Sequence, residues 1–370
     1  MTENYQICSS CIMDTSDPEI CFDDQGDCNY CLIAREKLPS YRFTKDRMDE
    51  NLTRLGDMIK KNSGTKSYDC ILGLSGGVDS SYVALLAKDM GLKPLCVHFD
   101  NGWNTEAAVV NIRKIVEHCG FELFTYVINW EEFRDLQRSF LKAGVIDLEM
   151  LSDHAIFASL FKLRRQFGIK YVLSGTNFTT ENGLPNSWIW SKMDTRNIKD
   201  IHRQYGTVRL KTFPLLSSLR WGLIKELGIG GVFLEPLNSI NYTKEGAMLE
   251  LEKVGWRYYG GKHYESIITK FYQSYILPTK FRVDKRRSHH SALIRNGEMD
   301  RTAALLDLEK PALGVEVLAS EKKFVCKKLG FTESEFDSLM EESPVAHDRF
   351  KTDRYFMQTV AKVGKFLLRR

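Results

Sequence analysis

The sequence has no apolar run that approaches the roughly 18 residues needed for a membrane-spanning helix. Its first residues, MTENYQICSSC, lack the basic and apolar segments of a secretory signal. Nine cysteines in 370 residues are too few and too unevenly placed for a disulfide scaffold. The net charge is only +4, which by itself does not indicate a nucleic-acid partner. We therefore expect a cytoplasmic enzyme that does not insert into a membrane.

The cysteines gather at the N-terminus, where Cys8 with Cys11 and Cys28 with Cys31 form two CxxC pairs. Each pair can place two thiolates on one metal, so two pairs complete a tetrahedral S₄ site of the zinc-ribbon kind. The loop between them is poor in apolar residues, and so small a segment needs a metal to hold its shape. We predict a closed, structural zinc site without catalytic function, with Cys21 outside the spacing. Free thiols in a disordered tail and an iron–sulfur cluster are the alternatives.

The middle of the chain alternates between short apolar runs and helix-like segments of ten or more residues. This alternation is typical of an α/β fold with a doubly wound parallel sheet. A narrow amphipathic stripe before it predicts a helical connector. The expected strands are residues 68–74, 93–100, 121–128 and 169–175. The expected domains are a zinc ribbon (1–35), a helical connector (36–66), an α/β domain (67–240) and a mostly helical C-terminal region (241–370).

The most informative residues spell SGGVDSS at positions 75–81, where the first strand should end and a helix begin. A helix N-terminus offers unpaired N–H groups and a positive dipole end to an anion. The glycines allow close approach of a phosphate, and Asp79 could hold Mg²⁺ against it. The spacing fits neither a Walker A nor a dinucleotide-binding glycine motif; a tight turn with a helix cap is the alternative. Predicted phosphate contacts are Ser75, Gly76, Gly77, Val78, Asp79, Ser80 and Ser81.

The SGGVDSS loop resembles the pyrophosphate loop of the PP-loop ATP pyrophosphatases, which have an adenine nucleotide alpha hydrolase-like fold. Asparagine synthetase, GMP synthetase, NAD synthetase and the tRNA thiolases belong to this group. They cleave ATP between its α and β phosphates, so that a substrate oxygen is adenylated and a nucleophile, often ammonia, displaces AMP. The resemblance extends to VHFDN at 97–101 and SGTN at 174–177, which end two further strands. It implies nucleotide contacts from Val97, Phe99, Asp100, Gly175 and Thr176.

Longer stretches resemble the N-acetyl sugar amidotransferases, asparagine-synthetase-like enzymes of bacterial lipopolysaccharide O-antigen and flagellin sugar biosynthesis. They include the N-terminal CSSCIMDTSDPEI with CNYC, then SGTNFTTENGLPNSW, and RYYGGKHYESIITKFYQSYILPTKFRVDKRRSHHSALIRNGEMDR. Cys21 departs from that family's ribbon but leaves the four ligands intact. The resemblance implies that ATP and Mg²⁺ adenylate the N-acetyl oxygen of a nucleotide-linked sugar, UDP-linked in our prediction. Ammonia then displaces AMP and leaves an acetamidino group.

Adenylation turns a poor leaving group into a good one, so the enzyme mainly positions its substrates and neutralises the released pyrophosphate. In the basic tract 280–290 we predict that Lys285 and Arg286 do so; a solvated face or an RNA patch is the alternative. Lys262, after two glycines, is a further candidate, although a plain turn explains the glycines. Glu181 could act as a base or orient ammonia, or could form a surface salt bridge.

Three other residues have a purely structural interpretation. Trp188 and Trp190 could stack on a uracil or sugar ring, but packing in the core explains them equally well. Asp153 precedes an apolar helix and could be only its N-cap.

The chain contains no recognisable glutaminase, and residues 1–66 are too few to hold one. Ammonia must then come from solution or from a partner. The resemblance implies a separate glutaminase and a cyclase-like channelling subunit, similar to the two subunits of imidazole glycerol phosphate synthase.

The main rival is a zinc-ribbon PP-loop tRNA thiolase. Sulfur transfer needs a reactive thiol, but the cysteines after the SGGVDSS loop include no CxxC pair, and the mild charge argues against tRNA. A nucleic-acid adaptor would leave the loop unexplained. We therefore expect no nucleic-acid partner.

Overall fold

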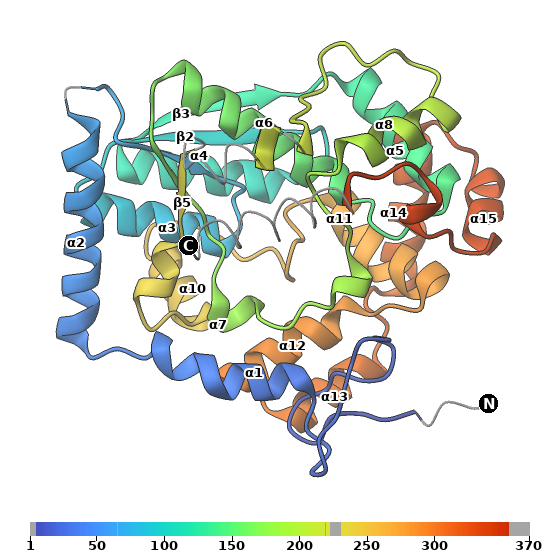
Figure 1. The fold of residues 1–370 in the computed structure, drawn as a ribbon, viewed down its shortest axis with the longest axis horizontal. Helices are drawn as coiled ribbons and strands as arrows, with labels where there is room; N and C mark the ends of the chain where they lie inside the picture. Colours follow the sequence, from blue (N-terminus) through green and yellow to red (C-terminus); the bar gives the residue numbers. More distant parts are fainter. Residues whose placement is uncertain (1–4, 65, 219, 223–230, 355–370) are drawn as a thin grey trace, which may run out of the picture.

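The computed structural model describes residues 5–64, 66–218, 220–222 and 231–354. A parallel five-stranded sheet in the order β3-β2-β1-β4-β5 lies at its centre (Figure 1). The chain begins in the middle of the sheet and adds strands first on one side and then on the other, so the sheet is doubly wound, as predicted. The strands are β1 (Cys70–Gly73), β2 (Pro94–Asp100), β3 (Glu122–Val127), β4 (Tyr171–Leu173) and β5 (Val232–Leu234).

The sequence predicted the first four strands to within two residues at each end. It did not predict β5, which pairs with β4 through Val172 and Phe233. A strand of three residues offers too little alternation to be recognised from pattern alone.

Helices cover both faces of the sheet because successive side chains of a strand point in opposite directions. Cys70 and Leu72 of β1 pack in the core on one face, and Ile71 packs on the other. The first face is covered by α2 (Lys45–Ser63), α3 (Val78–Asp89), α4 (Glu106–Cys119) and α10 (Lys244–Glu252). The second face is covered by α6 (Met150–Gln166).

Where the structure describes it, the C-terminal region is mostly helical, as predicted, and packs around three helices of the α/β domain in one further core. Those three are α5 (Trp130–Ala143), α8 (Thr195–Tyr205) and the start of α6. The region contains α11 (Ile267–Phe271), a π-helical segment (Tyr272–Phe281), α12 (Lys285–Asn296), α13 (Arg301–Glu309), α14 (Val315–Leu329) and α15 (Glu333–Glu341). Among the described residues, no helix has the length and apolar character that crossing a bilayer requires.

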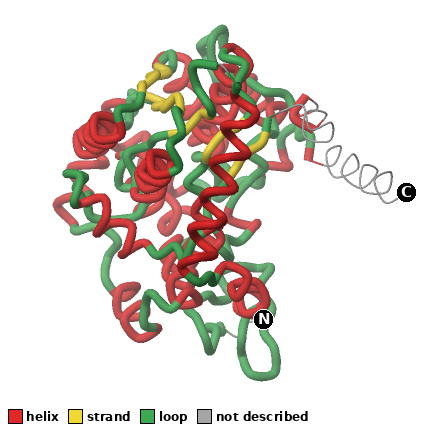
Figure 2. Tube along the Cα trace, turned by 90° about the vertical axis from the view of Figure 1, so that its left-hand side faces the viewer, coloured by secondary structure: helices red, strands yellow, loops and turns green. Residues whose placement is uncertain are grey.

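The N-terminal cysteine ribbon lies against α12 and α13 at one end of the molecule, while α2 runs along the outside (Figures 1 and 2). Arg301 donates hydrogen bonds to the carbonyl oxygens of Cys8 and Cys11, each at 2.9 Å. The guanidinium group of Arg287 lies 3.0 Å from the carboxylate of Asp14. The ribbon is thus bound to the C-terminal region by charged contacts. It continues through α1 (Asn29–Lys37) into the helical connector.

Candidate active site

A cavity of about 780 Å³ lies at the carboxyl ends of β1, β2 and β4. Ligands of open parallel sheets bind at this edge, where the strand order reverses. We call it the first cavity. Five residues that the sequence predicted as nucleotide contacts line it: Ser75, Val97, Phe99, Gly175 and Thr176.

The SGGVDSS loop is packed so tightly that only glycine fits at some of its positions. Gly76 has φ +82°, and a Cβ there would lie 2.5 Å from the carbonyl oxygen of Ala108. A Cβ at Gly175, after β4, would lie 2.9 Å from the backbone nitrogen of Ser80. The loop after β4 therefore touches the first turn of α3. Both loops meet where the free N–H groups of that helix begin.

The other predicted nucleotide and phosphate contacts lie outside the first cavity. Asp100 accepts hydrogen bonds from the backbone N–H of Gly102 at 2.9 Å and from the amide of Asn104 at 3.2 Å, so it closes the turn after β2. Ser81 is fully buried, and its hydroxyl group has no hydrogen-bond partner among the described residues. The remaining residues of the loop, apart from Ser75, also do not line the first cavity.

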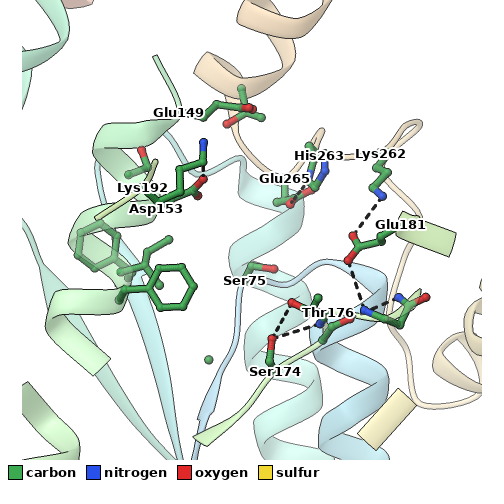
Figure 3. A pocket seen from close by; sticks show the side chains of 18 of the residues that line it. Ser75, Glu149, Asp153, Ser174, Thr176, Glu181, Lys192, Lys262, His263 and Glu265 are labelled. Atoms are coloured by element: carbon green, nitrogen blue, oxygen red, sulfur yellow. Dashed lines mark hydrogen bonds and ion pairs between the residues drawn. The ribbon is translucent and has the colours of Figure 1, made fainter. Parts of the chain in front are cut away.

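Glu181 and Lys262 form an ion pair inside the cavity, with 3.1 Å between Oε1 and Nζ (Figure 3). Their side chains are 28% and 19% exposed, so the pair is not a surface salt bridge. Burial acts to raise the pKa of Glu181, but the positive charges of Lys262 and His263 outweigh it and lower that pKa. Glu181 is therefore held as a carboxylate.

Lys262 reaches the site because the segment that carries it is tied to the loop after β2. The backbone N–H of Thr105 donates to the carbonyl of Glu265 at 3.0 Å, and that of Ile267 donates to Trp103 at 2.9 Å. His263 adopts φ +63°, a conformation that non-glycine residues seldom take. The segment that carries Lys262 lies beside the SGGVDSS loop, and its residues His263 and Glu265 form part of the wall of the first cavity (Figure 3).

Asp79 lies in the first turn of α3 and accepts a hydrogen bond from the hydroxyl group of Tyr242. Burial and the negative charge of Glu181 raise the pKa of Asp79. Glu181 acts on Asp79 through its negative charge, and carboxylate oxygens are ligands that suit a divalent cation. The donor set therefore fits Mg²⁺, which would be held by Asp79 and Glu181.

A second group of charges faces the Glu181–Lys262 pair across the cavity (Figure 3). Lys192 Nζ lies 2.7 Å from Asp147 and 3.0 Å from Asp153, and Lys285 pairs with Glu149. Glu149 is the N-cap residue of α6, so the interpretation of Asp153 as N-cap was wrong. Asp153 instead lies in the first turn and faces the cavity. Sequence reasoning missed Glu149 and Lys192.

The basic tract is not a solvated face, because most of its side chains bind within the protein. Arg286 pairs with Asp284 at 2.7 Å and donates to backbone carbonyls at the end of α13. Lys280 donates to the carbonyls of Leu339 and Glu342. Lys285 and Arg286, the two predicted pyrophosphate contacts, both reach cavity walls.

Neither Trp188 nor Trp190 offers a free ring face to the first cavity. Trp188 is 1% exposed and belongs to the core, while Trp190 stacks on His347 with 4.9 Å between ring centres. Packing in the core is therefore the correct interpretation of Trp188.

The N-terminal cysteines form a compact, buried cluster. Their four Sγ atoms lie within 4.8 Å of one another, with 3.7 Å between Cys8 and Cys31 and 3.6 Å between Cys11 and Cys28. A tetrahedral zinc with Zn–S bonds of about 2.3 Å requires S···S separations of about 3.8 Å. The cluster fits zinc, and Cys21 is exposed outside it.

Two family models match separate parts of the chain. Residues 69–176, which contain the SGGVDSS loop and the ends of β2 and β4, match the model described as asparagine synthase. This match defines an ATP-using amide ligase of the asparagine-synthetase type. Residues 265–364 match the model described as the C-terminal domain of WbpG-like LPS biosynthesis proteins. The chain is thus an asparagine-synthetase-like, ATP-dependent amidotransferase of LPS biosynthesis.

Individual proteins are similar over different lengths. An uncharacterized protein of Methanocaldococcus jannaschii is 25% identical over 314 residues, which are 84% of this chain and 95% of the relative. A GMP synthase [glutamine-hydrolyzing] of Thermosipho melanesiensis is 27% identical over 194 residues, 50% of this chain and 37% of that protein. The structure of NMN synthetase from Francisella tularensis aligns at a TM-score of 0.31 and 18% identity, covering 37% of this chain and 57% of that one.

Proposed function

We propose that the protein converts the N-acetyl group of a nucleotide-linked sugar, UDP-linked, into an acetamidino group for O-antigen or a related surface glycan. One observation carries this proposal. The first cavity is lined both by the asparagine-synthase segment and by Ser266, Thr269 and His289 of the WbpG-like segment. A site shared in this way brings the ATP chemistry of one segment to a substrate held by the other.

The proposed reaction has two steps. The amide oxygen attacks the α-phosphorus of ATP, the bond from that phosphorus to the bridging oxygen breaks, and pyrophosphate leaves with the electron pair. Ammonia then adds to the same carbon, and AMP leaves with the former amide oxygen while one proton is released. Because the amide is a poor electrophile, adenylation supplies the activation, and the protein supplies position and charge.

The residues have distinct proposed roles. Asp79 and Glu181 would hold Mg²⁺, which would neutralise the phosphate charge. Lys262, Lys285 and Arg286 offset the charge that develops on pyrophosphate. The lowered pKa of Glu181 makes it a weak proton acceptor, so its charge is better suited to orienting a cation than to general-base catalysis.

We further propose that ammonia comes from a separate glutaminase with a cyclase-like channelling subunit. The resemblance to sugar amidotransferases supports this, as does the GMP synthase relative, whose name states glutamine hydrolysis. Ammonium at high concentration should then replace the partners.

The test incubates the purified chain with ATP, Mg²⁺, ammonium and a panel of UDP-N-acetyl sugars, followed by mass spectrometry and nucleotide analysis. We expect one oxygen atom of the sugar to be replaced by an NH group, with AMP and pyrophosphate formed in equal amounts. Glutamine alone should support no reaction until a glutaminase is added. Stoichiometric ADP would exclude this mechanism. If no sugar reacts and a tRNA fraction gains sulfur, the thiolase assignment replaces ours.

A further inference from the structure

A second cavity, of about 490 Å³, adjoins the first. The two share a wall of three cationic or imidazole side chains, Lys262, Lys285 and His289, together with Thr180 and Gln273. We call Lys262, Lys285 and His289 the dividing wall. Asp79, from the first turn of α3, lines only the second cavity. The SGGVDSS loop therefore faces both cavities, Ser75 the first and Asp79 the second.

The lining of the second cavity is strongly basic. It contains five cationic residues against the two carboxylates of Asp79 and Asp307. The cationic residues are Lys244, Lys262, Lys285, Arg286 and Lys310. Three of them pair with carboxylates outside this lining, namely Glu181, Glu149 and Asp284. Among the described residues, Lys244 and Lys310 therefore supply the positive charge that can attract and hold a small polyanion.

Lys244 is the cationic residue of this lining that is most available to a ligand. In the part of the chain that the structure describes, its Nζ atom has no hydrogen bond or ion pair, unlike those of Lys262 and Lys285. Burial and the nearby charge of Lys262 lower the pKa of Lys244. Burial, together with Lys262, His263 and Lys285, also lowers the pKa of His289 well below its ordinary value. Positive charges thus gather around Lys244 and His289, and the carboxylates of Asp79, Glu265 and Glu298 offset them only in part at Lys244.

The geometry of phosphoryl transfer indicates which reaction product would enter the second cavity. The attacking and leaving oxygens lie nearly in line on opposite sides of the phosphorus. Pyrophosphate, which leaves next to Asp79 and Lys262, must therefore depart on the side away from the attacking amide oxygen. The first cavity is the larger one and contains Glu149, Asp153 and Lys192. We therefore assign the sugar and the adenosine to the first cavity.

We propose that the second cavity receives the pyrophosphate released from ATP and lets it leave without passing the adenylated sugar. This inference rests on the proposed function. Lys244 binds the departing anion, the dividing wall separates it from the first cavity, and Lys310, which is exposed, marks the outer opening. Pyrophosphate can then leave while the adenylated sugar still waits for ammonia, which prevents the first step from running backwards.

The test measures binding of magnesium pyrophosphate and, separately, of AMP to the full chain by calorimetry. Lys244→Ala and Lys310→Ala should each weaken pyrophosphate binding, Lys244→Ala by about tenfold, as loss of one charge-assisted contact predicts. AMP binding should not change. Lys253→Ala, which removes the same charge just after α10 but outside both cavities, is the matched control and should bind both ligands normally.

A further variant tests whether pyrophosphate occupies the second cavity, without changing the charge of its lining. Ala312 lines the second cavity only, so Ala312→Trp should fill it and reduce pyrophosphate affinity while AMP still binds. Unchanged thermal unfolding would show that each variant is folded. If AMP and pyrophosphate bind the wild type but none of the three substitutions affects pyrophosphate, the second cavity is not its compartment and the proposed function stands. If the wild type binds neither ligand, the proposed function itself is wrong.

Discussion

Replacing Lys262 by methionine keeps most of the side-chain volume and removes the charge that pairs with Glu181. At 3.1 Å and an effective dielectric constant of about 20, the two charges attract with about 5 kcal/mol. Desolvation and the remaining exposure of 19% and 28% reduce the net effect, so we expect Lys262→Met to lower the free energy of unfolding by about 1–3 kcal/mol. Urea unfolding at pH 7 measures this difference.

The pH dependence of that difference follows from the pKa of Glu181. Although burial raises this pKa, Lys262 lowers it below the ordinary value of 4.5. A carboxyl group with a lowered pKa stabilises the fold above its unfolded-state pKa, and the stabilisation is lost as pH falls through the folded-state value. The gap between wild type and Lys262→Met should therefore be widest near neutral pH and should narrow below pH 4.5.

The exposed pair of Lys253 and Glu250 provides the control. It has a similar ionic contact, at 2.6 Å, but its side chains are 66% and 51% exposed. Lys253→Met should change the free energy of unfolding by no more than about 0.5 kcal/mol, with no loss of turnover. Lys262→Met should lower kcat/KM by about 10²–10³-fold, as expected for a lost contact with developing charge. Equal, small effects of both substitutions, or a gap that widens in acid, would refute the electrostatic account of Lys262.

Three further predictions concern the cysteine cluster and the two loops. Purified protein should contain one zinc ion per chain; elemental analysis should find it lost in Cys28→Ser and retained in Cys21→Ser, whose thiol is exposed. Asp79→Asn should abolish most AMP formation, because the carboxylate that faces the pyrophosphate is lost, and an undiminished rate would contradict the assignment. Gly175→Ala should lower the free energy of unfolding by about 1–3 kcal/mol, because its Cβ would lie 2.9 Å from a backbone nitrogen, whereas Gly314→Ala, which meets open space, should have a smaller effect; equal effects would contradict the close packing.

The parts of the fold that the sequence predicted are those encoded by local pattern. The alternation of apolar runs and helices gave four of the five strands, and the two CxxC pairs gave the ligand cluster. Helix α12 was interpreted only as a basic tract, because KRRSHHSALIRN has no apolar periodicity. Its conformation depends on distant contacts, such as Ser291, which accepts a hydrogen bond from Ile12 at 3.2 Å. Such a contact cannot be predicted from the helix propensity of the local sequence.

The same distinction applies to the candidate site. Residues of the SGGVDSS loop were recognisable because one short segment contains all of them. Glu149, Asp153 and Lys192 come from a helix start and a loop about 40 residues apart, and no spacing in the sequence pairs them. Lys262 was predicted as a site residue because it follows two glycines, and Glu181 was predicted separately, from its position after the SGTN segment. Only the fold brings these two together.

The cysteine ribbon is linked to the active site from two directions. Ser187 donates to Asp17 of the ribbon at 2.8 Å, a few residues after Glu181. Arg295 of α12 donates to the side chain of Asn182 at 2.7 Å, next to Glu181, and contacts the thiol of Cys11 at 3.5 Å. The helix that carries Lys285 and the loop that follows Glu181 are therefore both fixed to the cysteine cluster. Because a structural zinc ion supplies folding free energy to so small a segment, the metal would hold the cationic and anionic sides of the site in register without touching substrate.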